Sequence, residues 1–114
     1  MRKSNAKKDI EAVKQYIERH YCEPITLEQL AVRSGLSATY LSSIYKQMYE
    51  VTPTEYVTQL RMIKAKQLMR NQKLRIKDIA AEVGFSDEFY FSRVFKKLEG
   101  TSPTKYKKFI AQDS

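Results

Sequence analysis

Hydrophobic positions recur along most of the chain at the three-to-four-residue spacing of amphipathic helices, and the longest such pattern is present twice. Residues 25–57 align with residues 74–107, first 49 positions apart and then, beyond one extra residue placed near Tyr90, 50 positions apart. Alanine, glycine, lysine, proline and tyrosine residues are identical at matched positions. Repetition of this kind indicates a duplicated structural unit.

The first copy reads as two short helices joined by a tight turn. Its apolar spacing predicts a helix over 27–34 that begins at a capping box opened by Thr26. Gly35, which adopts positive φ without steric cost, ends this helix, and Ser37 N-caps a second helix over about 38–48. Two short helices joined by such a turn form a helix-turn-helix.

The second copy repeats this plan with one difference, at the start of its first helix. Arg75 stands where Thr26 stood, so we expect no side-chain cap on the first helix. Ser86 is expected to N-cap the second helix, over about 87–98. The second copy therefore predicts another helix-turn-helix with a less well-capped beginning.

A third helix follows each unit, with Pro53 or Pro103 at its first helical position. The first of these is predicted to continue to about Asn71, a rod of roughly 27 Å that joins the two units. With an opening helix over about 7–21, the expected fold is all-α, with seven helices and no strands. The predicted organisation is an N-terminal extension (1–6), a first unit (7–58), the connecting helix (53–71), a second unit (72–111) and a tail (112–114).

The turn before each third helix differs between the copies. Gly100 occupies it in the second copy, whereas Glu50 occupies it in the first. If this position is left-handed, Glu50 costs roughly 1 kcal/mol relative to glycine, which the fold would survive.

The charge composition of the chain indicates what kind of partner this fold binds. The chain has 114 residues, with 21 Lys and Arg against 13 Asp and Glu, for a net charge of +8. Charge alone is equally consistent with soluble lysine-rich helices, but a basic face beside helix-turn-helix units favours DNA. The excess cations gather in Arg61, Lys64, Lys66, Arg70, Lys73, Arg75, Lys77, Arg93, Lys96, Lys97, Lys105, Lys107 and Lys108.

Other function classes find little support. The sequence has no apolar run of 18 or more residues and no signal-like start, so we expect a cytoplasmic protein without membrane contact. Cys22 and His20 are the only cysteine and histidine, which excludes a zinc site of Cys and His ligands alone. They lie two positions apart at a helix end, where side chains diverge, so we expect no catalysis and no cofactor.

The paired units, the long helix between them, and the segments GFS, YFSRVFKK and GTSP of the second unit resemble the DNA-binding domain of AraC/XylS-type transcriptional regulators over about residues 7–110. The resemblance implies a bacterial regulator that places two recognition helices in successive major-groove segments of promoter DNA. It leaves open whether the chain is a whole small regulator or part of a larger one. It implies DNA contacts by Ser37, Ala38, Thr39, Ser42, Ser43 and Lys46 in the first helix, and by Ser86, Asp87, Glu88, Phe89, Ser92, Arg93, Lys96 and Lys97 in the second.

Several of these positions allow a second interpretation. Ser37 and Ser86 are first of all N-caps, and Lys46 with its match Lys96 can serve either a phosphate or packing. Tyr40 and Phe89, paired by the alignment, are expected to be partly buried.

Arg93 can pair with a guanine or clamp a phosphate. The rival to DNA binding is a helical protein-interaction module, for example one that contacts RNA polymerase. That module would need exposed Leu, Met or Phe on the recognition helices, where Ser42, Ser43 and Ser92 are polar instead. Because no heptad seam is left over for a partner chain, we expect one monomer to occupy an asymmetric site.

Overall fold

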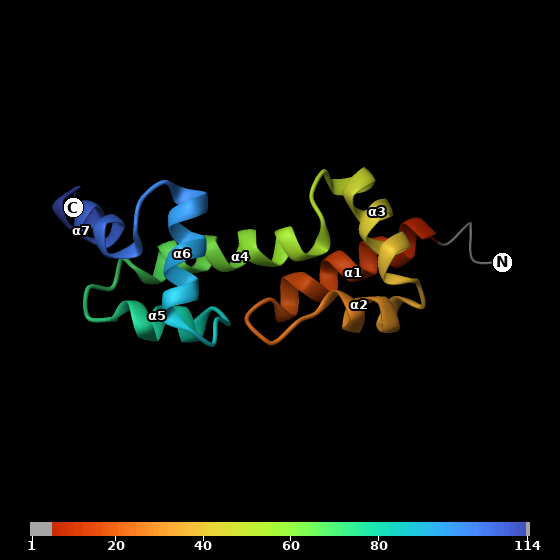
Figure 1. Ribbon diagram of the computed structural model, residues 1–114, viewed down its shortest axis with the longest axis horizontal. Coiled ribbons are helices and arrows are strands. Elements are labelled where there is room, and N and C mark those ends of the chain that lie inside the picture. Colours follow the sequence, from red (N-terminus) through yellow and green to blue (C-terminus); the bar gives the residue numbers. More distant parts are fainter. Residues whose placement is uncertain (1–5, 114) are drawn as a thin grey trace. The chain divides into compact units, whose positions relative to one another are not determined.

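The computed structural model describes residues 6–113, which form seven α-helices and no strand, as the sequence predicts (Figure 1). Ala6 opens the first helix, and the rest of the expected N-terminal extension, residues 1–5, lies outside the described residues, as does residue 114 of the expected tail. The helices are α1 (Ala6–His20), α2 (Leu27–Ser34), α3 (Ala38–Tyr49), α4 (Pro53–Leu68), α5 (Ile76–Glu82), α6 (Glu88–Glu99) and α7 (Pro103–Asp113).

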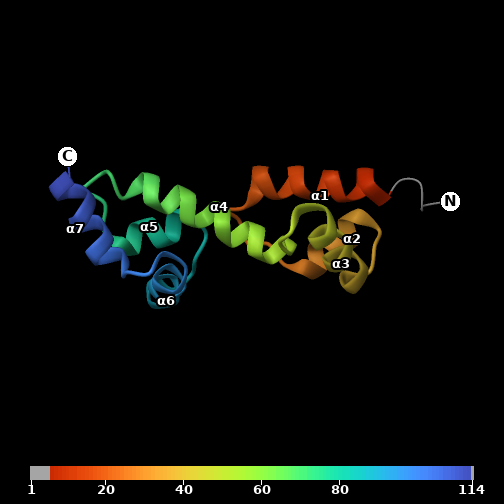
Figure 2. The same ribbon diagram turned by 90° about the horizontal axis from the view of Figure 1, so that it is seen from above.

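The chain divides into two compact units, and the division falls inside α4, between Leu60 and Arg61. In unit 1, α1 packs on both α2 and α3, and α2 packs on α3. In unit 2, α5 packs on α6 and α6 on α7, with α6 seen nearly end-on in Figure 2. Each unit therefore contains one helix-turn-helix and a core of its own.

The two cores repeat the same plan. In unit 1, α3 buries Leu41 and Tyr45, and in unit 2, α6 buries Phe91 and Phe95 at the matched positions. The helix that precedes each helix-turn-helix buries residues at the same spacing of three and then four positions, namely Ile10, Val13 and Ile17 in unit 1 and Met62, Ala65 and Met69 in unit 2. The first helix of unit 1 and the second half of α4 are thus equivalent, 52 positions apart.

The capping box at the start of α2 is confirmed. The Thr26 hydroxyl accepts from the Gln29 backbone N–H at 3.1 Å, and the Gln29 side chain accepts from the Thr26 N–H at 3.1 Å. The Ser37 hydroxyl caps α3 by accepting from the Tyr40 N–H at 3.1 Å. Arg75 provides no acceptor at the start of α5, also as predicted, because its side chain donates to Asp78.

The prediction of Ser86 as the cap of α6 is wrong, because Asp87 fills that position and accepts from the Phe89 N–H at 2.9 Å. Matched turns follow the glycines, where the N–H groups of Leu36 and Phe85 donate to carbonyls five residues earlier. The extra residue of the second copy therefore lies in the turn between Phe85 and Asp87 and not near Tyr90.

The long helix α4 ends at Leu68, three residues before the predicted Asn71. Arg70 and Asn71 donate their N–H groups to carbonyls three residues earlier, in turn geometry, and the Asn71 side chain accepts from the Lys73 N–H at 3.0 Å. Asparagine favours such a local hydrogen bond over helix continuation, which explains the earlier end. The other predicted helix boundaries lie within one residue of those observed.

The turn after the second helix of each helix-turn-helix, α3 or α6, is left-handed. Glu50 has φ 69° and ψ −2°, and Gly100 has φ 82° and ψ −4°. Glu50 is the one non-glycine residue with positive φ among the described residues, so the predicted backbone conformation at this site is confirmed.

Candidate nucleic-acid interface

The outward face of α3 gathers the residues expected to contact DNA from unit 1. Thr39, Ser43 and Lys46 are exposed, because Leu41 and Tyr45 turn the opposite face into the core. A shallow hollow on this face is lined by Ala38, Thr39, Ser42, Ser43 and Lys46, together with Leu27 and Thr52. The structure thus brings five of the six predicted residues of this helix together, with Ser37 at the helix start.

Sequence reasoning missed Leu27 and Thr52 in this hollow. Thr52 precedes Pro53 at the start of α4, and its hydroxyl accepts from the Glu55 N–H at 3.2 Å. Its proximity to α3 follows from the tight turn at Glu50, which the sequence indicates but does not place.

The outward face of α6 differs in chemistry. Phe89 is 69% exposed, contrary to the expected partial burial, since the first turn of α6 projects it away from the core residue Phe91. Arg93, Lys96 and Lys97 are also exposed, whereas Glu88 and Ser92 are half-buried. Ser86 and Asp87 are exposed at the helix start.

The observed caps change which residues of α3 and α6 correspond. Counted from the caps, Thr39 matches Phe89 and Ala38 matches Glu88. Tyr40 therefore matches Tyr90 and not Phe89, and these two tyrosines are 44% and 52% exposed. The start of α6 carries two carboxylates, those of Asp87 and Glu88, which interact favourably with the positive end of the helix dipole. Their negative charge disfavours the binding of a phosphate at this helix end. The start of α3 is neutral and can accept one.

Aromatic rings support Arg93 on its exposed face. The guanidinium carbon of Arg93 lies 5.7 Å from the centre of the Tyr90 ring, which in turn lies 5.8 Å from the Phe85 ring. Arg61 approaches Phe85 from α4, with its guanidinium carbon 5.4 Å from the ring centre. Cation–π contacts at exposed sites contribute about 0.5–1 kcal/mol each, enough to bias the direction of a long side chain.

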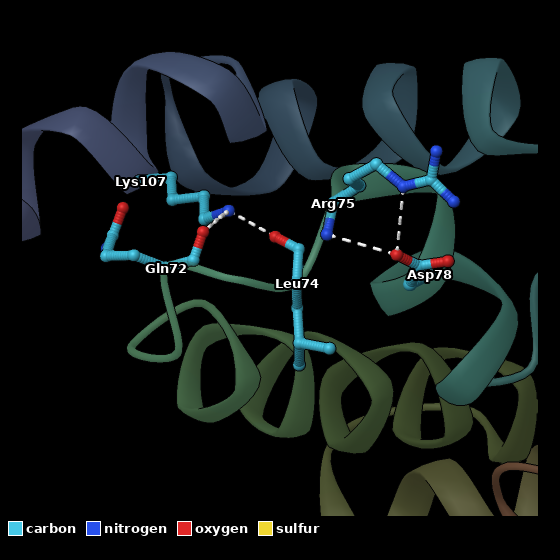
Figure 3. A network of polar contacts seen from close by, with 5 residues as sticks. All are labelled: Gln72, Leu74, Arg75, Asp78 and Lys107. Atoms are coloured by element: carbon cyan, nitrogen blue, oxygen red, sulfur yellow. Dashed lines mark hydrogen bonds and ion pairs between the residues drawn. The ribbon is translucent and has the colours of Figure 1, made fainter.

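The basic face expected from the sequence is smaller than the charge count suggests, because several cations have partners within unit 2. Lys66 pairs with Glu99 at 3.1 Å and Arg75 with Asp78 at 3.2 Å. The Lys107 ammonium donates to the backbone carbonyls of Gln72 and Leu74 and so holds the loop between α4 and α5 (Figure 3).

The Arg75–Asp78 contact also changes the pKa of the Asp78 carboxyl. Hydrogen bonds from the Arg75 side chain and backbone lower the pKa of the Asp78 carboxyl. Asp78 therefore stays ionised at the start of α5, where a negative charge is favourable.

Residues 6–113 contain no group of three or more side chains suited to hold a metal ion, and none of their helices is long and apolar enough to cross a bilayer. The His20 ring stacks on Tyr16 with centres 4.3 Å apart, and its Nδ1 lies 2.8 Å from a Glu23 carboxylate oxygen. His20 is thus engaged with Tyr16 and Glu23 rather than with Cys22.

Comparison with known proteins agrees with this geometry. The model of a family described as a helix-turn-helix domain matches residues 30–108. The transcriptional activator Btr of Bacillus subtilis is 46% identical over 85 residues, which cover 75% of this chain and 16% of that protein. The Msm operon regulatory protein of Streptococcus mutans is 36% identical over 107 residues, which cover 94% of this chain and 38% of that protein.

Among solved structures, the C-terminal domain of AraT, a response regulator from Geobacillus stearothermophilus, is 35% identical in sequence and matches with a TM-score of 0.83. The match covers 89% of this chain and 84% of that domain. The chain therefore spans a small part of its full-length curated relatives but nearly all of a separately solved domain. The named relatives are transcription regulators, a class without enzymatic activity.

Proposed function

The chain belongs to the AraC-type family of sequence-specific, DNA-binding helix-turn-helix regulators, and on that premise we propose that α3 and α6 are its two recognition helices, each inserted in a major-groove segment of promoter DNA. The observation that carries this assignment is the pair of outward faces opposite the buried residues Leu41 and Phe91. Each face presents side chains able to contact base edges, and each lies on the second helix of its helix-turn-helix.

The two helices differ in what they can discriminate. On α6, Arg93 can donate two hydrogen bonds to a guanine, and Glu88 can accept from a cytosine amino group. Each such pair is worth about 1–3 kcal/mol of discrimination. On α3, Thr39 and Ser43 offer a methyl group and single hydrogen bonds, which discriminate less. We therefore assign most of the sequence readout to unit 2.

Phosphate contacts complete the interface. Lys46 and Lys96 are exposed at matched positions one turn beyond the base-contacting residues, which supports a common role against the DNA backbone. The N-terminus of α3 at Ser37 is neutral and can add a backbone N–H contact to a phosphate. These contacts provide affinity and orientation rather than sequence preference.

The test begins with selection of bound duplexes from a random oligonucleotide pool. Binding of the best duplex is then compared for the protein as given and for Arg93→Ala, with Ser43→Ala at the matched position as control. We expect Arg93→Ala to weaken that duplex by about 1–3 kcal/mol and to relax preference at one base pair, and Ser43→Ala to cost distinctly less. A uniform loss on all sequences would instead assign Arg93 to a phosphate.

The alternative function is a protein-interaction module. Because the family acts in transcription, its partner would be RNA polymerase. Phe89 is a large apolar side chain exposed on α6, but its neighbours Arg93 and Lys96 are charged and α3 presents small polar groups. An apolar partner groove would be poorly matched by these faces. The same selection decides between the two, since a module without DNA readout would enrich no sequence.

A further inference from the structure

At one pair of matched positions, the two units carry side chains of opposite charge. In unit 1, the carboxylate of Glu18 accepts from the Lys14 ammonium at 3.0 Å and from the Tyr56 hydroxyl at 2.6 Å. This arrangement joins α1 to the start of α4. Both hydrogen bonds lower the pKa of the Glu18 carboxyl, so it is held as a carboxylate.

The same three positions exist in unit 2. The equivalence of the two cores aligns Lys66 with Lys14 and Arg70, in the turn that follows α4, with Glu18, each 52 positions further along the chain. Tyr106 matches Tyr56, and its ring packs on Phe95 as that of Tyr56 packs on Tyr45. Unit 2 thus keeps the cation and the hydroxyl but replaces the carboxylate by a second cation.

A hollow marks this place in unit 2. Lys66 and Arg70 line it from the α4 side and Tyr106 from α7, with Ile63 and Ile110 as apolar walls. Within the described residues, Lys66 is paired with Glu99, whereas neither the Arg70 guanidinium nor the Tyr106 hydroxyl has a hydrogen-bond or ion-pair partner. Ile63 is 51% exposed. The hollow therefore offers an uncompensated cation, a free hydroxyl and an apolar wall.

We propose that this hollow in unit 2 binds a small aliphatic carboxylate, which takes the place that the Glu18 side chain fills in unit 1. The carboxylate would accept from the Arg70 guanidinium and the Tyr106 hydroxyl, and its aliphatic stem would lie along Ile63 and Ile110. The carboxylate end follows from the template, since a glutamate side chain is a propionate group, and the longer aliphatic stem follows from the apolar walls at Ile63 and Ile110. No residue of α6 lines the hollow, so the site is separate from the proposed DNA contacts.

The experiment is a titration of the isotope-labelled chain with sodium hexanoate, followed by amide, arginine Nε–H and isoleucine methyl signals. We expect saturable shifts at Arg70, Tyr106 and Ile110, with a dissociation constant in the millimolar range, about 1–10 mM. 1-Hexanol has the same stem without the charge and should leave the Arg70 signal in place. Shifts spread over the exposed lysines, or none at all, would overturn the proposal.

Two variants separate the site from general charge attraction. Tyr106→Phe keeps the ring against Phe95 but removes the hydroxyl, and should weaken hexanoate binding about fivefold. Arg70→Glu supplies the carboxylate internally and should abolish the shifts at Tyr106 and Ile110 while the spectrum remains that of a folded chain. Unchanged hexanoate binding by either variant would refute the assignment, whatever the outcome of the DNA experiments.

Discussion

Replacing Glu50 by glycine should stabilise the protein, and the structure sets the size of the effect. Glu50 is left-handed at φ 69°, a conformation that costs a side-chain-bearing residue about 1–2 kcal/mol and glycine nothing. Glycine takes back part of this gain, about 0.4–1 kcal/mol, because it makes the unfolded chain more flexible. The expected net gain in the free energy of unfolding is about 0.5–1 kcal/mol.

The assay is thermal unfolding followed by circular dichroism. An unfolding entropy of about 2.1 cal/mol/K per residue gives roughly 0.24 kcal/mol/K for 114 residues, so the melting midpoint should rise by about 2–4 °C. If unit 1 unfolds alone, half as many residues share the change and the rise should be about 4–8 °C. A fitted unfolding enthalpy distinguishes these two cases.

Two controls isolate the backbone term. Glu50→Ala removes a negative charge from the carboxyl end of α3 but keeps the strained φ, so it reports the helix-dipole contribution alone. Gly100→Ala is the reciprocal change, because a Cβ at Gly100 would meet no atom within 4 Å and can cost stability only through its φ of 82°. The reasoning is refuted if Glu50→Gly stabilises no more than Glu50→Ala, or if Gly100→Ala is neutral.

Three further predictions follow from the core and the proposed interface. DNA affinity should fall steeply with salt, with a slope of log K against log salt near −5 to −7 for about six to eight phosphate contacts, and anisotropy titrations without a salt effect would contradict DNA binding. Tyr45→Phe should stabilise unit 1 by about 1 kcal/mol in urea denaturation, because the buried Tyr45 hydroxyl has no hydrogen-bond partner among the described residues and the matched Phe95 does without one; a clear loss would reveal a partner. Phe89, exposed on α6, should read a thymine methyl, so replacing one thymine of the selected duplex by uracil should weaken binding to the protein but not to Phe89→Ala, and equal losses for both would assign the methyl elsewhere.

Most of the fold could be predicted from local sequence signals for the starts and ends of helices. The capping box at Thr26, the glycine at position 35 and the prolines at the starts of α4 and α7 each act over a few residues, so their meaning can be read without the rest of the chain. The failures occur where two adjacent residues compete for one role. Ser86 and Asp87 are both good N-caps by residue type, so the local sequence does not decide between them, and the structure has Asp87 as the cap of α6.

The candidate site was less predictable because it depends on contacts between distant segments. Charge counting could not show that Lys107 is occupied by the carbonyls of Gln72 and Leu74, since these lie more than thirty positions away in sequence. The exposure of Phe89 was missed because two apolar residues at aligned positions were interpreted as partly buried. An alignment displaced by one residue paired it with Tyr40, whereas the observed cap pairs it with Thr39.

The repeated units differ in how their backbone turns and buried hydroxyl groups affect stability. Unit 1 carries the strained Glu50 and the unsatisfied hydroxyl of Tyr45, where unit 2 has Gly100 and Phe95. Unit 1 has the Glu18 network that links α1 to α4, and unit 2 lacks that carboxylate. Each unit is therefore stabilised by a different balance of backbone geometry and polar contacts around the same buried positions. The duplicated sequence preserves the packing plan, while the residues that differ set the stability and the surface chemistry of each copy.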